Sequence, residues 1–394
     1  MNEQMLSDGL AQTTLHPLEL RVSHANGSRI TLENGKEIID FISGIGASSF
    51  GHGHSSILNA IHKQVDKHLH VMVYGETRQS AQDLAAHRLL GMLPDSLSAV
   101  YFVNSGAEAI DAAMKLTRRV TKRTKIIAFS GGYHGNTFGA LSVSSSAERK
   151  APFAPLVGDV ELVEWNEMDG LRAIDASVAS VIVETIQGDA GIRIPETSWM
   201  RALREKCTQV GAHLILDEIQ CGFGRTGRPF AFEHFGIVPD HLCLGKALGG
   251  GMPMGAVVSK KTDLQQFAHS PSLGHITTFG GHPVPCAASA EASKLLKNTD
   301  WVRVEQVGAI IEKTLQASEQ VHEVRRIGLY IAVEMASAEA VNQVIQSALE
   351  QGVLIFYFLS TPNAFRIAPP LNISDADLHE ALDTLLACFE QVNT

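Results

Sequence analysis

The middle of the chain alternates between short, continuous apolar runs and longer stretches in which apolar residues recur three and four positions apart. A continuous apolar run between turn residues is typical of a strand covered on both faces, and the longer pattern is typical of an amphipathic helix. The predicted helices include 105–120 and 197–210, and the predicted strands are 99–103, 125–129, 160–163, 181–184, 214–217, 242–244 and 256–259. This order predicts an α/β domain with a mostly parallel central sheet.

The two ends of the chain follow other patterns. Residues 29–32 and 37–41, with Asn34-Gly35 between them, predict a hairpin. Further helices are expected at 56–67, 80–93, 287–296, 301–318, 338–350 and 375–392, and further strands at 329–333, 354–358 and 365–368. We therefore expect a large domain at 51–285, a smaller α+β domain at 286–394, and an N-terminal segment, 1–50, that joins the small domain.

Composition narrows the class of protein. The 394 residues are 45% hydrophobic and 19% charged, which is sufficient for large buried cores. A net charge of −10 argues against nucleic-acid and anionic-membrane partners. Five scattered cysteines without CxxC spacing favour a reducing compartment. Because we find neither a signal peptide nor an apolar run long enough to span a bilayer, we expect a cytoplasmic protein.

Lys246 is the only formally charged residue in the run HLCLGKALGGGMPMGAVVS, which lies between Asp240 and Lys260. Burial in such surroundings lowers the pKa of an amine and makes it a nucleophile toward carbonyls. Taken alone, a lysine that snorkels from the end of a buried strand is the commoner explanation. The remaining motifs favour the chemical interpretation.

Two glycine-containing turns follow predicted strands. Ser105, Gly106 and Ala107 open a helix, where free N–H groups and the helix dipole can hold a phosphate; an ordinary capped helix is the alternative. The run Gly131-Gly132-Tyr133-His134-Gly135 follows the next strand, and Tyr133 offers a flat face to a ring. A tight turn with an incidental aromatic residue is the alternative for this second motif.

Glu184 and Asp217 each end an apolar strand. Burial of a carboxylate there is costly without a partner, which could be a protonated heterocycle, a metal or a structural ion pair. Positions 184, 217 and 246 are separated by 33 and 29 residues, about one strand and helix each. All three are therefore expected at the same edge of the sheet.

Two other motifs point elsewhere. Gly222-Phe223-Gly224-Arg225-Thr226-Gly227 matches the dinucleotide pattern G-x-G-x-x-G, but Pro229 and an aromatic run follow where a helix is required. His52-Gly53-His54 suggests a metal, but no further ligands stand at metal spacing. We predict neither a nicotinamide site nor a metal site.

Together these residues fit pyridoxal phosphate. Its aldehyde would bind Lys246, its ring nitrogen Asp217, and its phosphate the helix at Ser105, with Tyr133 against the ring. The cofactor withdraws electrons, and the acid keeps its ring nitrogen protonated.

The motifs resemble those of class III (omega-amino acid) aminotransferases, a family of fold type I pyridoxal phosphate enzymes that includes ornithine, acetylornithine and 4-aminobutyrate aminotransferases. The matching segments run from about residue 34 to the C-terminus and include NSGAEA, GGYHG, VETIQGDAG, LDEIQCGFGRTG, LGKALGGGMPMGA, TTFGGHP and RIAPPL. The resemblance implies transfer of an amino group between an amine donor and a 2-oxo acid in two half-reactions.

The resemblance also implies roles for single residues. Lys246 forms the Schiff base and moves the proton, and Asp217 pairs with the pyridine nitrogen. The expected cofactor-binding residues are Ser105, Gly106, Ala107, Tyr133, His134, Glu184, Asp217, Ile219, Gln220, Lys246 and Thr278. Thr278 is expected to reach the phosphate of a neighbouring subunit, so a homodimer with shared active sites follows. Arg366 is expected to bind a substrate carboxylate and Asp189 to gate it.

Three positions depart from the family pattern. Asn136 stands where many relatives have an arginine that binds a distal carboxylate, which leaves use of 2-oxoglutarate open. Asp189 stands in place of a glutamate, with a shorter reach to Arg366, and Cys221 in place of a threonine. The alternatives are a racemase, aminomutase or phospho-lyase on the same fold, and a non-catalytic binding protein.

Overall fold

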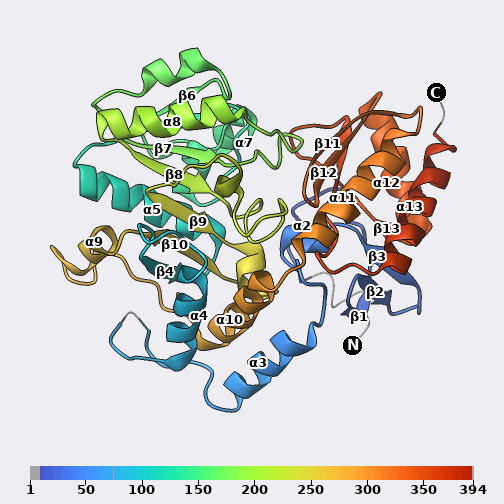
Figure 1. The fold of residues 1–394 in the computed structure, drawn as a ribbon, viewed down its shortest axis with the longest axis horizontal. Coiled ribbons are helices and arrows are strands. Elements are labelled where there is room, and N and C mark those ends of the chain that lie inside the picture. Colours follow the sequence, from blue (N-terminus) through green and yellow to red (C-terminus); the bar gives the residue numbers. More distant parts are fainter. Residues whose placement is uncertain (1–8, 74, 393–394) are drawn as a thin grey trace.

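The computed structural model describes residues 9–73 and 75–392, and a large α/β part lies beside a smaller part in Figure 1. The first eight residues, within the stretch searched for a signal peptide, lie outside the described residues. The large part contains a seven-stranded sheet in the order β4-β10-β9-β8-β7-β5-β6. Its strands are β4 (Ala99–Val103), β5 (Lys125–Phe129), β6 (Val160–Val163), β7 (Val178–Glu184), β8 (His213–Asp217), β9 (His241–Leu244) and β10 (Gly255–Ser259).

Most neighbouring strands of this sheet are parallel. β5 pairs in parallel with β6 and β7, and β8 pairs in parallel with β7 and β9. Only β10 is antiparallel to its neighbours, β4 and β9. The predicted α/β fold with a mostly parallel sheet is therefore confirmed.

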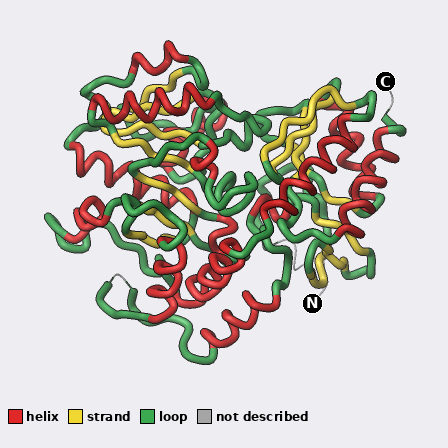
Figure 2. Tube along the Cα trace, viewed as in Figure 1, coloured by secondary structure: helices red, strands yellow, loops and turns green. Residues whose placement is uncertain are grey.

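The sheet is buried on both faces, as Figure 2 shows by the helices on either side of its strands. On β8, Leu214 and Leu216 pack in the core that includes α8, whereas Ile215 packs in the core that includes α5. Successive residues of a strand face opposite sides, so two apolar cores require a continuous apolar run. The helices of this part are α3 (Ser55–Val65), α4 (Ser80–Leu90), α5 (Gly106–Thr121), α6 (Phe138–Val143), α7 (Ala147–Lys150), α8 (Thr197–Val210), α9 (Lys261–Leu264) and α10 (Pro283–Lys297).

Short 3-10 helices complete the large part. They are η1 (Ala151–Phe153), η2 (Met168–Ala173), η3 (Ala231–His234), η4 (Lys246–Gly249) and η5 (Gln265–Ala268). The one that matters for the site is η4, because it begins at Lys246 directly after β9.

The smaller part contains two four-stranded sheets, ordered β1-β2-β3-β13 and β11-β12-β15-β14. Its strands are β1 (Val22–Asn26), β2 (Arg29–Leu32), β3 (Glu37–Asp40), β11 (Val321–Ile327), β12 (Tyr330–Met335), β13 (Val353–Leu354), β14 (Phe356–Tyr357) and β15 (Ala364–Ile367). Its helices are α2 (Ser43–Gly46), α11 (Trp301–Gln316), α12 (Ala338–Glu350) and α13 (Asp375–Phe389).

The prediction of one strand at 354–358 is wrong. β13 pairs with β3, whereas β14 pairs with β15 in the other sheet. Ile355, which is buried, joins the two strands. An apolar run indicates burial, but it does not reveal that its two halves belong to different sheets.

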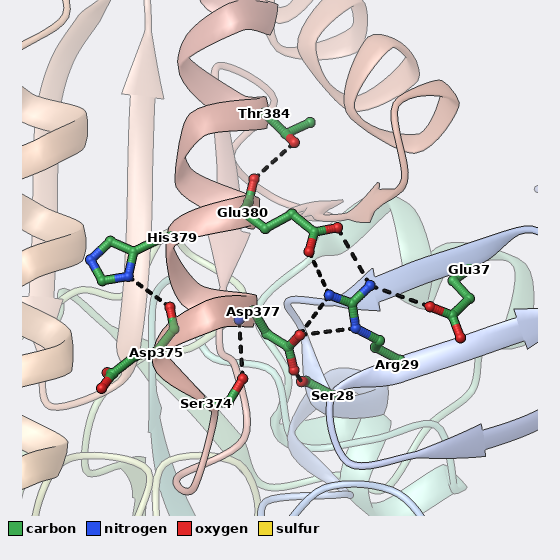
Figure 3. Close-up of polar contacts among 9 residues, drawn as sticks. All are labelled: Ser28, Arg29, Glu37, Ser374, Asp375, Asp377, His379, Glu380 and Thr384. Atoms are coloured by element: carbon green, nitrogen blue, oxygen red, sulfur yellow. Dashed lines mark hydrogen bonds and ion pairs between the residues drawn. The ribbon is translucent and has the colours of Figure 1, made fainter.

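The N-terminal hairpin is tied to the C-terminal helix, as Figure 3 shows. Arg29 of β2 donates through Nε to Asp377 Oδ1 of α13 at 2.9 Å, and its Nη2 lies 2.5 Å from Glu380 Oε2. Ser28 also donates to Asp377. These contacts, with the pairing of β3 and β13, support the proposal that the N-terminal segment belongs with the small domain.

The domain boundary near residue 285 stays a prediction. α10 continues across this position, and it packs against α3 and α4 of the large part. α11 packs instead against β11 of the small part. We therefore propose that the boundary lies after α10, between Lys297 and Trp301.

Candidate active site

Lys246 lies at the first position of η4, with its backbone in the left-handed region at φ 44°. A non-glycine residue in this region is strained, and such strain is concentrated at functional sites. Burial lowers the pKa of the Lys246 ammonium, while Asp217 and Glu184 oppose the shift and Arg366 adds to it. The lowered pKa increases the fraction of neutral, nucleophilic amine near neutral pH.

Asp217 is the last residue of β8, and its buried carboxylate is held from two sides. Oδ2 lies 2.7 Å from His134 Nδ1, and Oδ1 accepts a hydrogen bond from Ile219 N at 3.0 Å. His134 is itself buried, and its backbone N–H donates to Ser144 Oγ at 2.9 Å. Among the described residues, the side-chain partner of this carboxylate is therefore a histidine.

Glu184 ends β7 and is the Cα partner of Asp217 in the neighbouring strand, so the two acids share one sheet edge as predicted. Its carboxylate accepts hydrogen bonds from Tyr133 N and Gly188 N, each at 2.9 Å. Burial raises the pKa of Glu184 to about 7; the charge of Asp217 adds to this shift, and His134 opposes it. Glu184 thereby fixes the backbone of the 131–135 loop.

The start of α5 faces Ile219, the residue two positions after Asp217. Ser105 caps the helix by accepting a hydrogen bond from Glu108 N at 3.2 Å. Glu108 reaches back to Asn104 N at 2.7 Å, one residue earlier than a standard capping box. A Cβ on Gly106 would lie 2.8 Å from Ile219 Cδ1, so only glycine allows this approach.

Arg366 of β15 and Asp189 form a buried ion pair, with Nη2 3.3 Å from Oδ1. The shorter aspartate therefore does reach the arginine. The guanidinium also lies over the Phe358 ring, 4.5 Å from its centroid. Arg366 Nε is buried without a hydrogen-bond partner among the described residues.

The other predicted residues are less closely connected. Asn136 is exposed, and its amide donates to Tyr133 Oη at 3.3 Å. Burial raises the pKa of Tyr133, and the charge of Asp189 adds to the shift. Thr278 is exposed in the loop between η5 and α10, and within the described part no hydrogen bond or ion pair joins its side chain to the other predicted residues.

Tyr330 is a site residue that the sequence did not reveal. Its ring is buried on β12, and its Oη has no hydrogen-bond partner among the described residues. A Cβ on Gly188 would collide with both Tyr330 Oη and Gln220 Oε1, so these two groups converge on Gly188. Burial raises the pKa of Tyr330, so the phenol stays protonated as a donor. No sequence motif marks this tyrosine, because its position depends on packing between the two parts.

The glycine pattern at 222–227 has a structural role. No helix begins within this segment, and the next described element is η3. Arg225 is buried and donates to the carbonyl oxygens of Leu329 and Pro369 and to Ser49 Oγ. The segment thus joins the large part to the small part.

Two further histidine contacts bear on the question of a metal site. His52 Nε2 lies 2.7 Å from Asp40 Oδ2, so the contact ties the loop that carries His52 to the end of β3. His213, His241 and Asp263 bring ligand atoms within 4.8 Å of one another. However, the two imidazoles contact each other at 2.7 Å, whereas ligands on tetrahedral zinc stand about 3.3 Å apart. This distance describes a hydrogen-bonded pair.

Comparisons with known proteins show the family of this chain. Residues 10–389 match the family described as Aminotransferase class-III. The acetylornithine aminotransferase of Methanopyrus kandleri is 37% identical over 390 residues, covering 98% of each chain. That of Bacillus subtilis is 34% identical over 376 residues, covering 93% of this chain and 94% of its own.

A solved structure shows the same fold. The ornithine aminotransferase of Toxoplasma gondii superposes with a TM-score of 0.90 at 29% identity, covering 99% of this chain and 93% of the other. The chain belongs to the class III aminotransferases. It is an enzyme that transfers amino groups with pyridoxal phosphate. Within the described residues, no helix has the length and apolar character needed to cross a membrane.

Proposed function

We propose that this enzyme moves an amino group between an amino acid or ω-amine donor and a 2-oxo acid, with Lys246 and Asp217 as its catalytic residues. The observation that carries the proposal is the amine of Lys246, whose pKa burial lowers, within the electrostatic reach of the acids Asp217 and Glu184. A neutral amine can accept a proton from substrate carbon and return it, which is general acid–base catalysis.

The residues present fit pyridoxal phosphate. A Cβ on Gly245 would lie 3.1 Å from Ile219 Cγ2 and 3.3 Å from Gly106 Cα. The backbone just before Lys246 therefore packs closely against Ile219 and the start of α5. The N–H groups at the start of a helix suit a phosphate. When bound, the cofactor supplies an aldehyde that condenses with amines and a ring that withdraws electrons.

Each neighbouring residue has a positioning task. Asp217, fixed by His134, places a negative charge where a protonated ring nitrogen would need it. Tyr133 and Ile219 would hold the two faces of the ring, and Gln220 would contact its 3′-oxygen. Ser105, Gly106 and Ala107 would hold the phosphate, as the capped start of α5 supports.

The substrate is proposed to carry at least one carboxylate. Arg366 has a buried Nε without a partner, which a carboxylate could take. Asp189 would neutralise the arginine when a substrate lacks that group. Two relatives are named acetylornithine aminotransferases, so an acylated ω-amino acid is the first donor to test. The amide of Asn136 suits an uncharged distal group better than a carboxylate.

A homodimer with shared active sites is also proposed. Exposed apolar side chains gather on two loops, at Leu69, Val71, Met72, Leu273, Ile276 and Phe279. The loops are adjacent, because the rings of His70 and Phe279 are 5.0 Å apart. A second subunit on this surface would cover the apolar side chains and bring Thr278 of the partner subunit toward a phosphate at α5. The cytoplasmic location stays a prediction; all five cysteines are free.

The test is the Lys246→Ala variant, with Lys260→Ala as a matched control on an exposed lysine. We expect the first variant to lose turnover and the visible absorbance of lysine-bound cofactor, and the control to keep both. Borohydride trapping followed by mass spectrometry should place the cofactor on Lys246. A label elsewhere, or retained turnover in Lys246→Ala, would refute the proposal.

Donor and acceptor are separate questions. A matrix of amines, including N-acetylornithine, against pyruvate, glyoxylate and 2-oxoglutarate would identify the preferred pair. Release of an oxo-acid product supports amino transfer. Isomerisation of one substrate without a co-substrate would instead favour a racemase or aminomutase.

A further inference from the structure

One loop contacts both members of the Asp189–Arg366 ion pair. This loop, Phe358 to Ser360, follows β14 and precedes β15, and we refer to it as the 358–360 loop. Leu359 N donates to Asp189 Oδ1 at 2.9 Å, and Ser360 Oγ donates to Asp189 Oδ2 at 2.8 Å. The ring of Phe358 lies under the guanidinium of Arg366.

The loop holds Asp189 by shorter contacts than the arginine does. Arg366 Nη2 reaches Asp189 Oδ1 at only 3.3 Å, and this is the single hydrogen bond between the two side chains. An unrestrained carboxylate and guanidinium prefer two parallel hydrogen bonds. Here Oδ2 is instead turned toward Ser360, so the guanidinium keeps donors, including Nε, for another anion.

The loop also borders the predicted cofactor side of the site. Ser360 lines one cavity together with Tyr133, Asn136 and Arg149. The carbonyl oxygen of Leu359 accepts a long hydrogen bond from Arg149 Nη2 at 3.5 Å. A ligand beside Tyr133 would therefore lie close to the hydroxyl group that fixes Asp189.

We propose that Ser360 determines how well Arg366 binds carboxylate ligands, because its hydroxyl group keeps Asp189 from pairing with both arms of the guanidinium. This inference rests on the proposed role of Arg366. Without the Ser360 hydroxyl, Asp189 Oδ2 turns to the arginine and competes with the substrate carboxylate. Ser360 is thus a positioning residue that favours donors and acceptors with a carboxylate over amines without one.

The test compares two ligands of the same length on the cofactor-loaded enzyme. Pentanoate carries a carboxylate and pentanamide does not, and their inhibition constants report binding without requiring turnover of either. The variants are Ser360→Ala, Ser360→Thr, which keeps the hydroxyl group, and Asp189→Ala. The control is Ser347→Ala, which removes an exposed hydroxyl hydrogen-bonded to Gln391 on the small domain.

We expect Ser360→Ala to weaken pentanoate binding about tenfold, the lower end of the effect of one lost hydrogen bond to a charged group. Pentanamide binding should stay within about twofold, and Ser360→Thr should restore pentanoate binding. In an Asp189→Ala background, Ser360→Ala should have no further effect on pentanoate, because the competing carboxylate is gone.

Three results would overturn the inference: no preference of the wild-type enzyme for pentanoate, parallel changes for both ligands in Ser360→Ala, or an undiminished effect in the Asp189→Ala background. Amino transfer by the wild-type enzyme is measured on the same preparation. Its absence would refute the proposed function, whereas the ratio of the two inhibition constants decides the role of Ser360.

Discussion

Asp217 Oδ2 and His134 Nδ1 lie 2.7 Å apart, and both side chains are buried. The acid comes from the end of β8 and the histidine from the loop after β5, so the contact reaches across the end of β7, which lies between these two strands in the sheet. Because Ile219 N holds the other carboxylate oxygen, Asp217 has little freedom to rotate. The negative charge is therefore preorganised.

Replacement of Asp217 by asparagine tests the importance of this charge. Asparagine keeps the size and one acceptor oxygen, but it cannot stabilise a protonated ring nitrogen. We expect kcat to fall by about 100-fold or more, as for other preorganised electrostatic groups. The control is Asp240→Asn, because Asp240 is bound by Arg204 and by Leu214 N at the opposite sheet edge. Equal losses of kcat in the two variants would contradict the assigned role.

A side chain at position 106 should weaken cofactor binding. In Gly106→Ala the new Cβ would lie 2.8 Å from Ile219 Cδ1 and Cγ2, so Ile219, the residue proposed to hold one face of the cofactor ring, must move. We expect a higher dissociation constant for pyridoxal phosphate, measured by absorbance titration. The added Ile219→Ala substitution should recover part of the loss, since it removes the clash. Gly158→Ala is the control, because a Cβ there meets no atom within 4 Å.

His241 should make the protein sensitive to mild acid. Burial, together with the charge of the neighbouring His213, lowers the pKa of His241 to about 3. The unfolded chain takes up a proton near pH 6.5, but the folded chain does not until about pH 3. Stability is therefore lost as pH falls below about 6.5, by at most about 1.4 kcal/mol per pH unit from this residue.

Urea unfolding at pH 7.5, 6.5 and 5.5 measures this effect. The His241→Leu variant should lose less stability between pH 6.5 and 5.5 than the wild-type protein. The exposed His322 provides the control, and His322→Leu should keep the wild-type dependence. A His241→Leu curve parallel to that of the wild-type protein would show that another group titrates.

The Arg29 contacts in Figure 3 should stabilise the packing of the N-terminal hairpin against the C-terminal helix α13. We expect Arg29→Met to lower the free energy of unfolding by about 1–3 kcal/mol, because charged hydrogen bonds to Asp377 and Glu380 are lost. Burial alone would raise the pKa of Asp377, but hydrogen bonds from Ser28 and Arg29 hold this pKa below its ordinary value. The stabilisation is thus present above about pH 4 and is lost as pH falls below it.

The measurement is the difference in unfolding midpoint between wild-type and Arg29→Met proteins at pH 7 and pH 3.5. The difference should shrink at the lower pH. Arg303→Met removes a more exposed pair with Asp375, so it should change the midpoint little. A larger effect of Arg303→Met than of Arg29→Met would contradict this account.

The sequence predicted the parts of the fold that local patterns determine. The continuous run from Leu214 to Leu216 predicted a strand with two covered faces, and each face has its own helix-containing core. The break at Ile355 was not predictable, because hydrogen bonding to β3 on one side and β15 on the other depends on distant partners. α10 begins at Pro283 with His282 as its cap, which are local signals, but its packing on α3 and α4, which places it with the large part, depends on distant residues.

The candidate site followed the same rule. Lys246 and Asp217 stood out because each places a charge in an apolar run, and that pattern is local. Strand spacing alone predicted Glu184 and Asp217 at the same sheet edge, and the pairing of β7 with β8 confirms it. Tyr330 and Ser360 were not found, because neither belongs to a motif and both enter the site from the smaller part.

The left-handed backbone at Lys246 means that folding and chemistry make opposite demands on this position. Glycine would adopt φ 44° without penalty and would bring no amine to desolvate. A Lys246→Gly chain should accordingly resist denaturants better than the natural one while lacking its reactivity. The enzyme thus gives up some folding stability at this residue, and substitutions chosen to stabilise the protein must leave Lys246 unchanged.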